Sequence, residues 1–189
     1  MPSFYSVVRL LNKKVDEPPY IKVGEFLYRF KTEKKETYLV LVEEYVNQLF
    51  VVKFYLKAHQ HSKNKYKELI CKLDSCQEHK KDSVPRNSRK IIFTCMEVCR
   101  QLSEQYPLHS FAFIGCPKLG TDETYENNQR FRIYGKIALT FVSNDNFRHY
   151  EDKKYSVFIL INQANLKENV NLFNLYQSMY MKHIVGFLE

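Results

Sequence analysis

The chain has 189 residues, 44% of them hydrophobic and 26% charged, which is the composition of one globular domain spanning residues 1–189. Its five glycines form neither G-x-G-x-x-G nor G-x-x-x-x-G-K-[ST], so the sequence argues against dinucleotide-binding and P-loop folds. The longest apolar run, 157–161, is too short to span a bilayer, and the first residues lack the pattern of a secretory leader. We therefore expect a soluble, cytoplasmic protein without a membrane partner.

The five cysteines are an odd number in a chain that starts without a leader-like segment, which favours free thiols over a disulfide framework. Cys95 and Cys99 are one helical turn apart, and such pairs usually face a core. The sequence contains no C-x-x-C pair. We therefore predict no metal site.

The positive charge is concentrated in one segment. Residues 53–90 contain eleven Lys and Arg residues and four Asp and Glu residues, whereas the whole chain has a net charge of +8. Two interpretations follow, a solvated lysine-rich connection or a surface for an anionic partner, either nucleic acid or an acidic protein. Residues 58–84 form the polar part of this segment, and we expect them to be an insertion with at most one short helix.

The first half of the chain predicts β-strands. Aromatic and β-branched residues, or an alternation of apolar and polar residues, mark four runs: Phe4–Leu11, Glu25–Lys31, Thr37–Val42 and Leu49–Leu56. Short connections, including a turn expected at Glu43–Asn47, join the last three runs. Such connections reverse the chain, so these three strands should form an antiparallel meander.

Helices alternate with strands in the second half. The expected elements are a helix from Asn87 or Ser88 to Tyr106, a strand at Phe111–Gly115, a helix with the acidic residues Asp122, Glu123 and Glu126 at its start, a strand at Tyr155–Ile161 and a C-terminal helix capped by Asn165. This order predicts an α/β (α+β) domain. Its central sheet should be mixed and mainly antiparallel, with about six or seven strands and flanking helices.

The second of these helices contains a family-like segment. Asn127, Arg132, Tyr134 and Lys136 have the spacing of N-E-R-A-I-R-F-Y-E-K-L-G-F in GNAT-type acyltransferases, and Ala138 stands where the family prefers glycine. With the element order, residues 20–162 resemble this family. The resemblance implies that acyl-CoA binds between the fourth strand and the following helix, and that an acyl group is transferred to an amine.

The same resemblance gives Tyr134 the role of the general acid that protonates the departing thiolate. A general base toward the amine must come from the acids near the meander, which are Glu25, Glu43 and Glu44. The turn expected at Glu43 and Glu44 would leave both in solvent. Glu25 is therefore the candidate base.

The cofactor loop of the family reads R/Q-x-x-G-x-G/A, because glycines let backbone N–H groups approach the pyrophosphate. The corresponding residues here are Arg86, Asn87, Ser88, Arg89 and Lys90, followed by Ile91. Arg89 and Ile91 replace the two glycines. We therefore predict that acetyl-CoA binds no more tightly than about 1 mM, although a helix N-terminus flanked by basic residues would still attract an anion.

Two functions remain open at this point. The chain is either an N-acyltransferase that uses acyl-CoA, or a non-catalytic GNAT-like protein whose residues 53–90 bind nucleic acid or an acidic protein.

Overall fold

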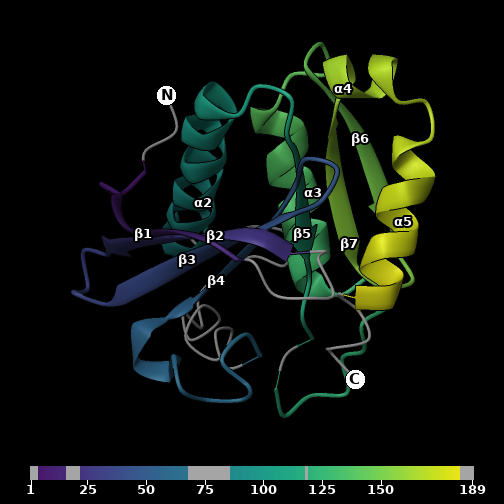
Figure 1. The fold of residues 1–189 in the computed structure, drawn as a ribbon. Coiled ribbons are helices and arrows are strands. Elements are labelled where there is room, and N and C mark those ends of the chain that lie inside the picture. Colours follow the sequence, from purple (N-terminus) through teal and green to yellow (C-terminus); the bar gives the residue numbers. More distant parts are fainter. Residues whose placement is uncertain (1–3, 16–21, 68–85, 118, 184–189) are drawn as a thin grey trace.

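A computed structural model describes residues 4–15, 22–67, 86–117 and 119–183, with the backbone alone at 86–88, 141 and 180–183. Seven strands form one sheet in the order β1-β2-β3-β4-β5-β7-β6, with helices on both faces (Figure 1). The elements in chain order are β1 (Val8–Lys14), β2 (Lys22–Lys31), β3 (Thr37–Tyr45), β4 (Leu49–Leu56), the 3-10 helix η1 (Lys57–His59), α2 (Arg86–Gln105), β5 (Ser110–Ile114), α3 (Gln129–Phe141), β6 (Phe147–Asp152), β7 (Val157–Asn162), α4 (Gln163–Glu168) and α5 (Leu172–His183).

The predicted mixed sheet is confirmed. Strands β1 to β4 are antiparallel neighbours, and β5, β7 and β6 are also joined by antiparallel pairs. The two groups meet where β4 and β5 run parallel. A parallel pair needs a long crossover, and here the crossover includes α2. The fold is therefore a single α/β domain with a C-terminal helix, as the sequence indicated.

Several strands differ from the sequence prediction, most of them at a boundary. Strand β1 begins at Val8 rather than Phe4, because Tyr5 is buried and its backbone N–H donates to Thr94 Oγ1 at 2.9 Å. Strand β3 continues to Tyr45 through the expected turn. Strand β6 was not predicted, because its sequence FRHYED is polar and it lies at the edge of the sheet.

The helices follow the predicted order with two corrections at their ends. Helix α3 begins at Gln129, after the acidic residues, and Glu123 Oε1 accepts from its first backbone N–H at 2.6 Å. The C-terminal region holds two helices rather than one. Asn162 caps α4, whereas Asn165, the predicted cap, lies inside α4 and is buried.

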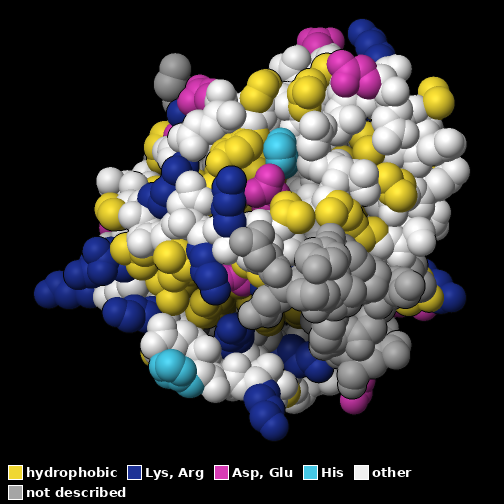
Figure 2. Space-filling view, in the orientation of Figure 1, with side chains coloured by type: hydrophobic (Ala, Val, Ile, Leu, Met, Phe, Trp, Pro, Cys, Tyr) yellow, Lys and Arg dark blue, Asp and Glu magenta, His cyan; other side chains and the backbone are white. Residues whose placement is uncertain are grey.

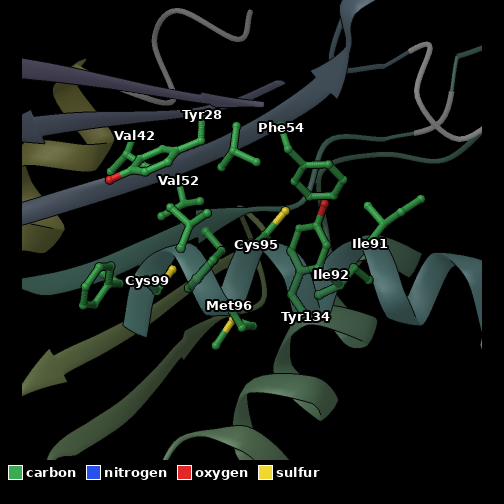
Figure 3. Packing of buried hydrophobic residues seen from close by; sticks show 14 of the residues in the cluster. Tyr28, Val42, Val52, Phe54, Ile91, Ile92, Cys95, Met96, Cys99 and Tyr134 are labelled. Atoms are coloured by element: carbon green, nitrogen blue, oxygen red, sulfur yellow. The ribbon is translucent and has the colours of Figure 1, made fainter. Parts of the chain in front are cut away.

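Helices α2 and α3 cover one face of the sheet, here called the helix-covered face. Aromatic rings from β2, β3 and β4 meet the apolar side of α2 there (Figure 3). Cys95 and Cys99 are buried free thiols in this contact, as predicted, and burial raises the pKa of both. On the opposite face, Leu172, Tyr176 and Met179 of α5 pack against strands from β4 to β7. Of the described residues, none belongs to a helix long and apolar enough to cross a membrane.

Candidate functional site at the fork between β4 and β5

Strands β4 and β5 pair over four residues and then separate. The last pair is Val52 with Phe113. Beyond it β4 continues to Leu56, while Ile114 pairs with Val157 of β7 and the Gly115 N–H donates to Ser156 O at 2.8 Å. The chain after β5 therefore turns away from β4. We call the space between the two diverging segments the fork.

Helix α3 is fixed at the fork by its first turn. Asn128 caps the helix by accepting from the Phe131 N–H at 3.0 Å, and its own side-chain amide donates to Gly115 O. A Cβ at Gly115 would clash with Asn128 Oδ1, which explains why a glycine directly follows β5. The residues on the inner side of α3 thus lie against the fork.

Tyr134 projects from α3 between α2 and the sheet (Figure 3). Its ring centroid lies 6.0 Å from that of Phe54 and 6.4 Å from that of Phe113, and the residue is 9% exposed. Burial raises the pKa of its hydroxyl, with Arg130 opposing the shift. Within the described chain the hydroxyl has no hydrogen-bond partner. The predicted burial of Tyr134 is confirmed.

The polar partners of Tyr134 in the family-like segment lie elsewhere. Asn127, Arg132 and Lys136 are exposed. The side chain of Arg132 donates to Asn127 O, so this pair holds the turn that precedes the helix. Asn127 also has a positive φ of 45°, which asparagine tolerates better than most residues. These residues stabilise the start of α3 and do not face the fork together with Tyr134.

Arg130 ties the segment after η1 to the fork. Its Nη1 donates to Tyr66 O, and its Nη2 lies 3.5 Å from Lys67 O. The Tyr66 ring meets Tyr55 of β4 edge-on, with ring centroids 5.5 Å apart. Residues 66 and 67 therefore cover the end of β4 beside the fork.

Cys116 follows the fork immediately after β5 and is 7% exposed. Burial raises the pKa of its thiol, and the positive charges of Arg130, Lys53 and Lys67 oppose this shift. The thiol thus lies within electrostatic reach of three cations from three parts of the chain. Since its pKa is raised, Cys116 is a thiol rather than a nucleophilic thiolate at neutral pH.

A second polar cluster lies on the opposite face of the sheet. Glu43, 8% exposed, accepts from Lys53, from Lys22 at 3.4 Å and from the Tyr45 hydroxyl at 3.0 Å. Burial acts to raise the pKa of Glu43, but these partners outweigh it and hold that pKa below its usual range. Glu43 was expected in a solvated turn, so this expectation was wrong. The positive charge of Lys53 stabilises the Glu43 carboxylate at this buried position of the strand.

Glu25, the candidate base, belongs to the same cluster and forms an ion pair with Lys22. Glu25 is paired with Glu43 of the neighbouring strand, so the two lie on the same face, whereas Tyr134 packs on the helix-covered face. The structure therefore places Glu25 and Tyr134 on opposite faces. The third acid, Glu44, lies 3.0 Å from His109 Nε2.

The five predicted cofactor residues form the first turn of α2. Arg89 is exposed, and Lys90 makes a 2.8 Å ion pair with Glu33 while its ammonium lies 4.3 Å from the centroid of the Tyr5 ring. For Arg86, Asn87 and Ser88 the backbone alone is described. Residues 68–85, which hold most of the predicted insertion, lie outside the described residues.

Sequence reasoning missed Arg130 although a signal was present. Arg130, Tyr134 and Ala138 follow one another at intervals of four residues, so they share a helix face. A charged residue on an otherwise apolar face indicates a buried charge. Tyr66 and Cys116 carried no comparable signal, because the contacts that bring them to the fork join distant parts of the chain.

The half of the molecule built from residues 4–67 is cationic at its surface. Its described residues include thirteen Lys and Arg and five Glu, and each of these glutamates contacts a Lys, His or Tyr of the protein. Exposed lysines without a carboxylate partner in the described chain are Lys13, Lys14, Lys31, Lys34, Lys35, Lys57 and Lys63. Figure 2 shows Lys and Arg side chains spread over this side, around a group of hydrophobic side chains.

Comparisons with known proteins found no matching family model, no matching curated protein and no matching solved structure. In the described chain, no three His, Cys, Asp or Glu side chains are arranged to hold a metal ion. A proposal about function therefore rests on the fork and on the cationic surface.

Proposed function

We propose that this chain is a non-catalytic GNAT-like protein that binds nucleic acid through the cationic surface of residues 4–67. The observation that carries the proposal is the separation of charges on this half. Its glutamates contact other side chains of the protein, whereas seven exposed lysines have no carboxylate partner in the described residues. What this surface offers to a ligand is positive charge.

Nucleic acid suits this distribution better than an acidic protein does. The lysines lie on β1, on the turn between β2 and β3 and around η1, so they are spread rather than gathered around one pocket. Lysine contacts with a phosphate backbone need no fixed geometry, and each releases counterions.

The fork argues against acyl transfer as the function. An acyl-CoA thiolate needs a proton donor of similar pKa close to it, but burial raises the pKa of Tyr134, whose ring packs against Phe54 and Phe113. Residues 66 and 67 cover the neighbouring end of β4. Glu25 lies on the other face, and Arg89 and Ile91 stand where the cofactor loop needs glycines.

The proposal is tested with two variants of equal charge. In one, Lys13, Lys34, Lys57 and Lys63 become Gln. In the control, Lys136, Arg148, Lys153 and Lys167, which are exposed on the other half, become Gln. Binding of labelled single-stranded and duplex DNA is measured from low to physiological salt. The first variant should weaken binding and reduce the slope of log K against log salt by about 0.9 per lost phosphate contact on duplex.

Three results would overturn the proposal. They are equal losses in both variants, no binding by the parent at physiological salt, or preferential binding of poly-glutamate over DNA. Acetyl-CoA is titrated in parallel by calorimetry, and we expect no binding tighter than about 1 mM. Micromolar affinity for acetyl-CoA would restore the acyltransferase interpretation.

A further inference from the structure

Arg130 is a buried cation without an acidic partner in the described chain. The residue is 6% exposed, and its guanidinium contacts the carbonyl oxygens of Tyr66 and Lys67. Its Nε is inaccessible to solvent and has no hydrogen-bond partner among the residues that the structure describes. A buried guanidinium is costly unless its charge is balanced and its N–H groups are bonded. Within the described residues, Arg130 therefore has no balancing carboxylate and keeps one unbonded donor beside the fork.

The open donors of Arg130 lie on one edge of its guanidinium. Nη1 is engaged by Tyr66 O, while the 3.5 Å contact from Nη2 to Lys67 O is at the limit of a hydrogen bond. Nε–H and one N–H of Nη2 point in the same direction on a guanidinium. Two parallel donors of this kind match two oxygens of a carboxylate or a phosphate.

The surroundings of this edge are positively charged. Cys116 is reached by the charges of Arg130, Lys53 and Lys67. Lys53 is balanced by Glu43, but Lys67 has its ammonium 5.9 Å from the centroid of the Tyr125 ring and no carboxylate partner in the described residues. In the described part of the chain, Arg130 and Lys67 are thus two cations near the fork without a carboxylate partner. The helix N-terminus adds no free site, because Glu123 accepts from its first N–H.

We propose that the fork holds a small-oxyanion site, in which Nε and Nη2 of Arg130 bind two oxygens and Lys67 supplies the second charge. Because two cations are unbalanced, the site should prefer the phosphate dianion to a carboxylate of single charge. This site is separate from the exposed lysines proposed to bind nucleic acid. Each proposal can therefore fail without the other.

The first experiment follows Arg130 directly in the full-length wild-type protein. The arginine Nε–H signals are recorded by ¹⁵N NMR while inorganic phosphate, acetate or chloride is added at constant ionic strength. The Arg130 signal should shift with phosphate and saturate in the millimolar range, and acetate should bind at least tenfold more weakly. No shift with phosphate, or the same shift with chloride, would overturn the proposal. Equal affinities for phosphate and acetate would overturn the preference for a dianion.

The second experiment compares two conservative variants. Arg130→Lys keeps the charge but removes the paired donors, and Arg132→Lys changes an exposed arginine of the same helix. Calorimetry with inorganic phosphate should show at least a tenfold loss for Arg130→Lys and no change for Arg132→Lys. Equal losses in both would contradict the proposal. If Arg130→Lys fails to fold, the wild-type titration decides, because its signal is then assigned by selective labelling of neighbouring residues.

Discussion

The two faces of β2, β3 and β4 are built from alternate residues of the same strands, yet they are stabilised differently. On the helix-covered face the rings of Tyr5, Phe30 and Tyr38 stack in series, with centroid distances of 5.6 Å and 5.3 Å. On the opposite face Glu43 lies between Lys22 and Lys53. Substitutions on the first face should act through lost packing at any pH. Substitutions on the opposite face should destabilise the protein by leaving a buried charge without its partner, and their effect on stability should depend on pH.

The largest expected effect is on the helix-covered face. Tyr134→Ala removes a buried ring that lies between Phe54 and Phe113, and it should lower the free energy of unfolding by about 3–5 kcal/mol. Tyr134→Phe should leave stability nearly unchanged, because the hydroxyl has no hydrogen-bond partner in the described chain. Chemical denaturation measures both.

Leu139→Ala is the control, since Leu139 lies on the same helix and is 56% exposed. Its expected change is within about 0.5 kcal/mol. If Tyr134→Ala cost no more than this control, the packing role of Tyr134 would be wrong.

An intermediate effect is expected on the opposite face. Lys53→Met leaves the buried Glu43 without its nearest cation and should cost about 2–3 kcal/mol, because removal of one partner exposes the desolvation cost of the other. Combining it with Glu43→Leu should recover most of the loss. Denaturation at neutral pH measures the single and double variants, and a double variant as unstable as Lys53→Met would contradict the charge argument.

The pH dependence of this cluster has a defined sign. The pKa of Glu43 is lowered in the folded protein by Lys53, so its contribution is present above the unfolded pKa of about 4.3 and is lost as the pH falls through the folded value. Stability of Glu43→Gln should therefore fall less than that of the parent between pH 6 and pH 3.5. No comparable difference is expected for Tyr134→Phe.

The smallest effect concerns His149 of β6. Both ring nitrogens are buried without a hydrogen-bond partner in the described part of the chain, and burial lowers the pKa of the ring while Glu151 opposes the shift. Because folding lowers the pKa of His149, the protein has its full stability above the unfolded pKa of about 6.5. The free energy of unfolding then decreases as the pH falls below that value, since the unfolded chain binds the proton more readily. His149→Phe should reduce the loss of thermal stability between pH 7.5 and pH 5.5. The exposed His61, changed to Phe, should leave that loss as in the parent.

Local pattern predicted the meander and the main helices because each carries its own periodicity. The bounds of β4, Leu49–Leu56, agree with the prediction. The pattern failed for β6, which is polar at the sheet edge, and for Glu43, whose burial depends on a lysine of the next strand. The fork was beyond local reasoning, since Arg130 and Tyr66 are 64 residues apart.

The parallel pair of β4 and β5 also requires the longest chain segment between neighbouring strands of the sheet. The loops between β2, β3 and β4 are short, whereas 53 residues separate Leu56 from Ser110. Closing a loop of that length costs about 2 kcal/mol more in chain entropy than closing one of about four residues. Four residue pairs join the two halves across this junction. Hydrogen bonds thus run through the whole sheet, but the β4–β5 pairing has a high cost in chain entropy. The contacts that α2 and α3 make across this pairing help to stabilise it.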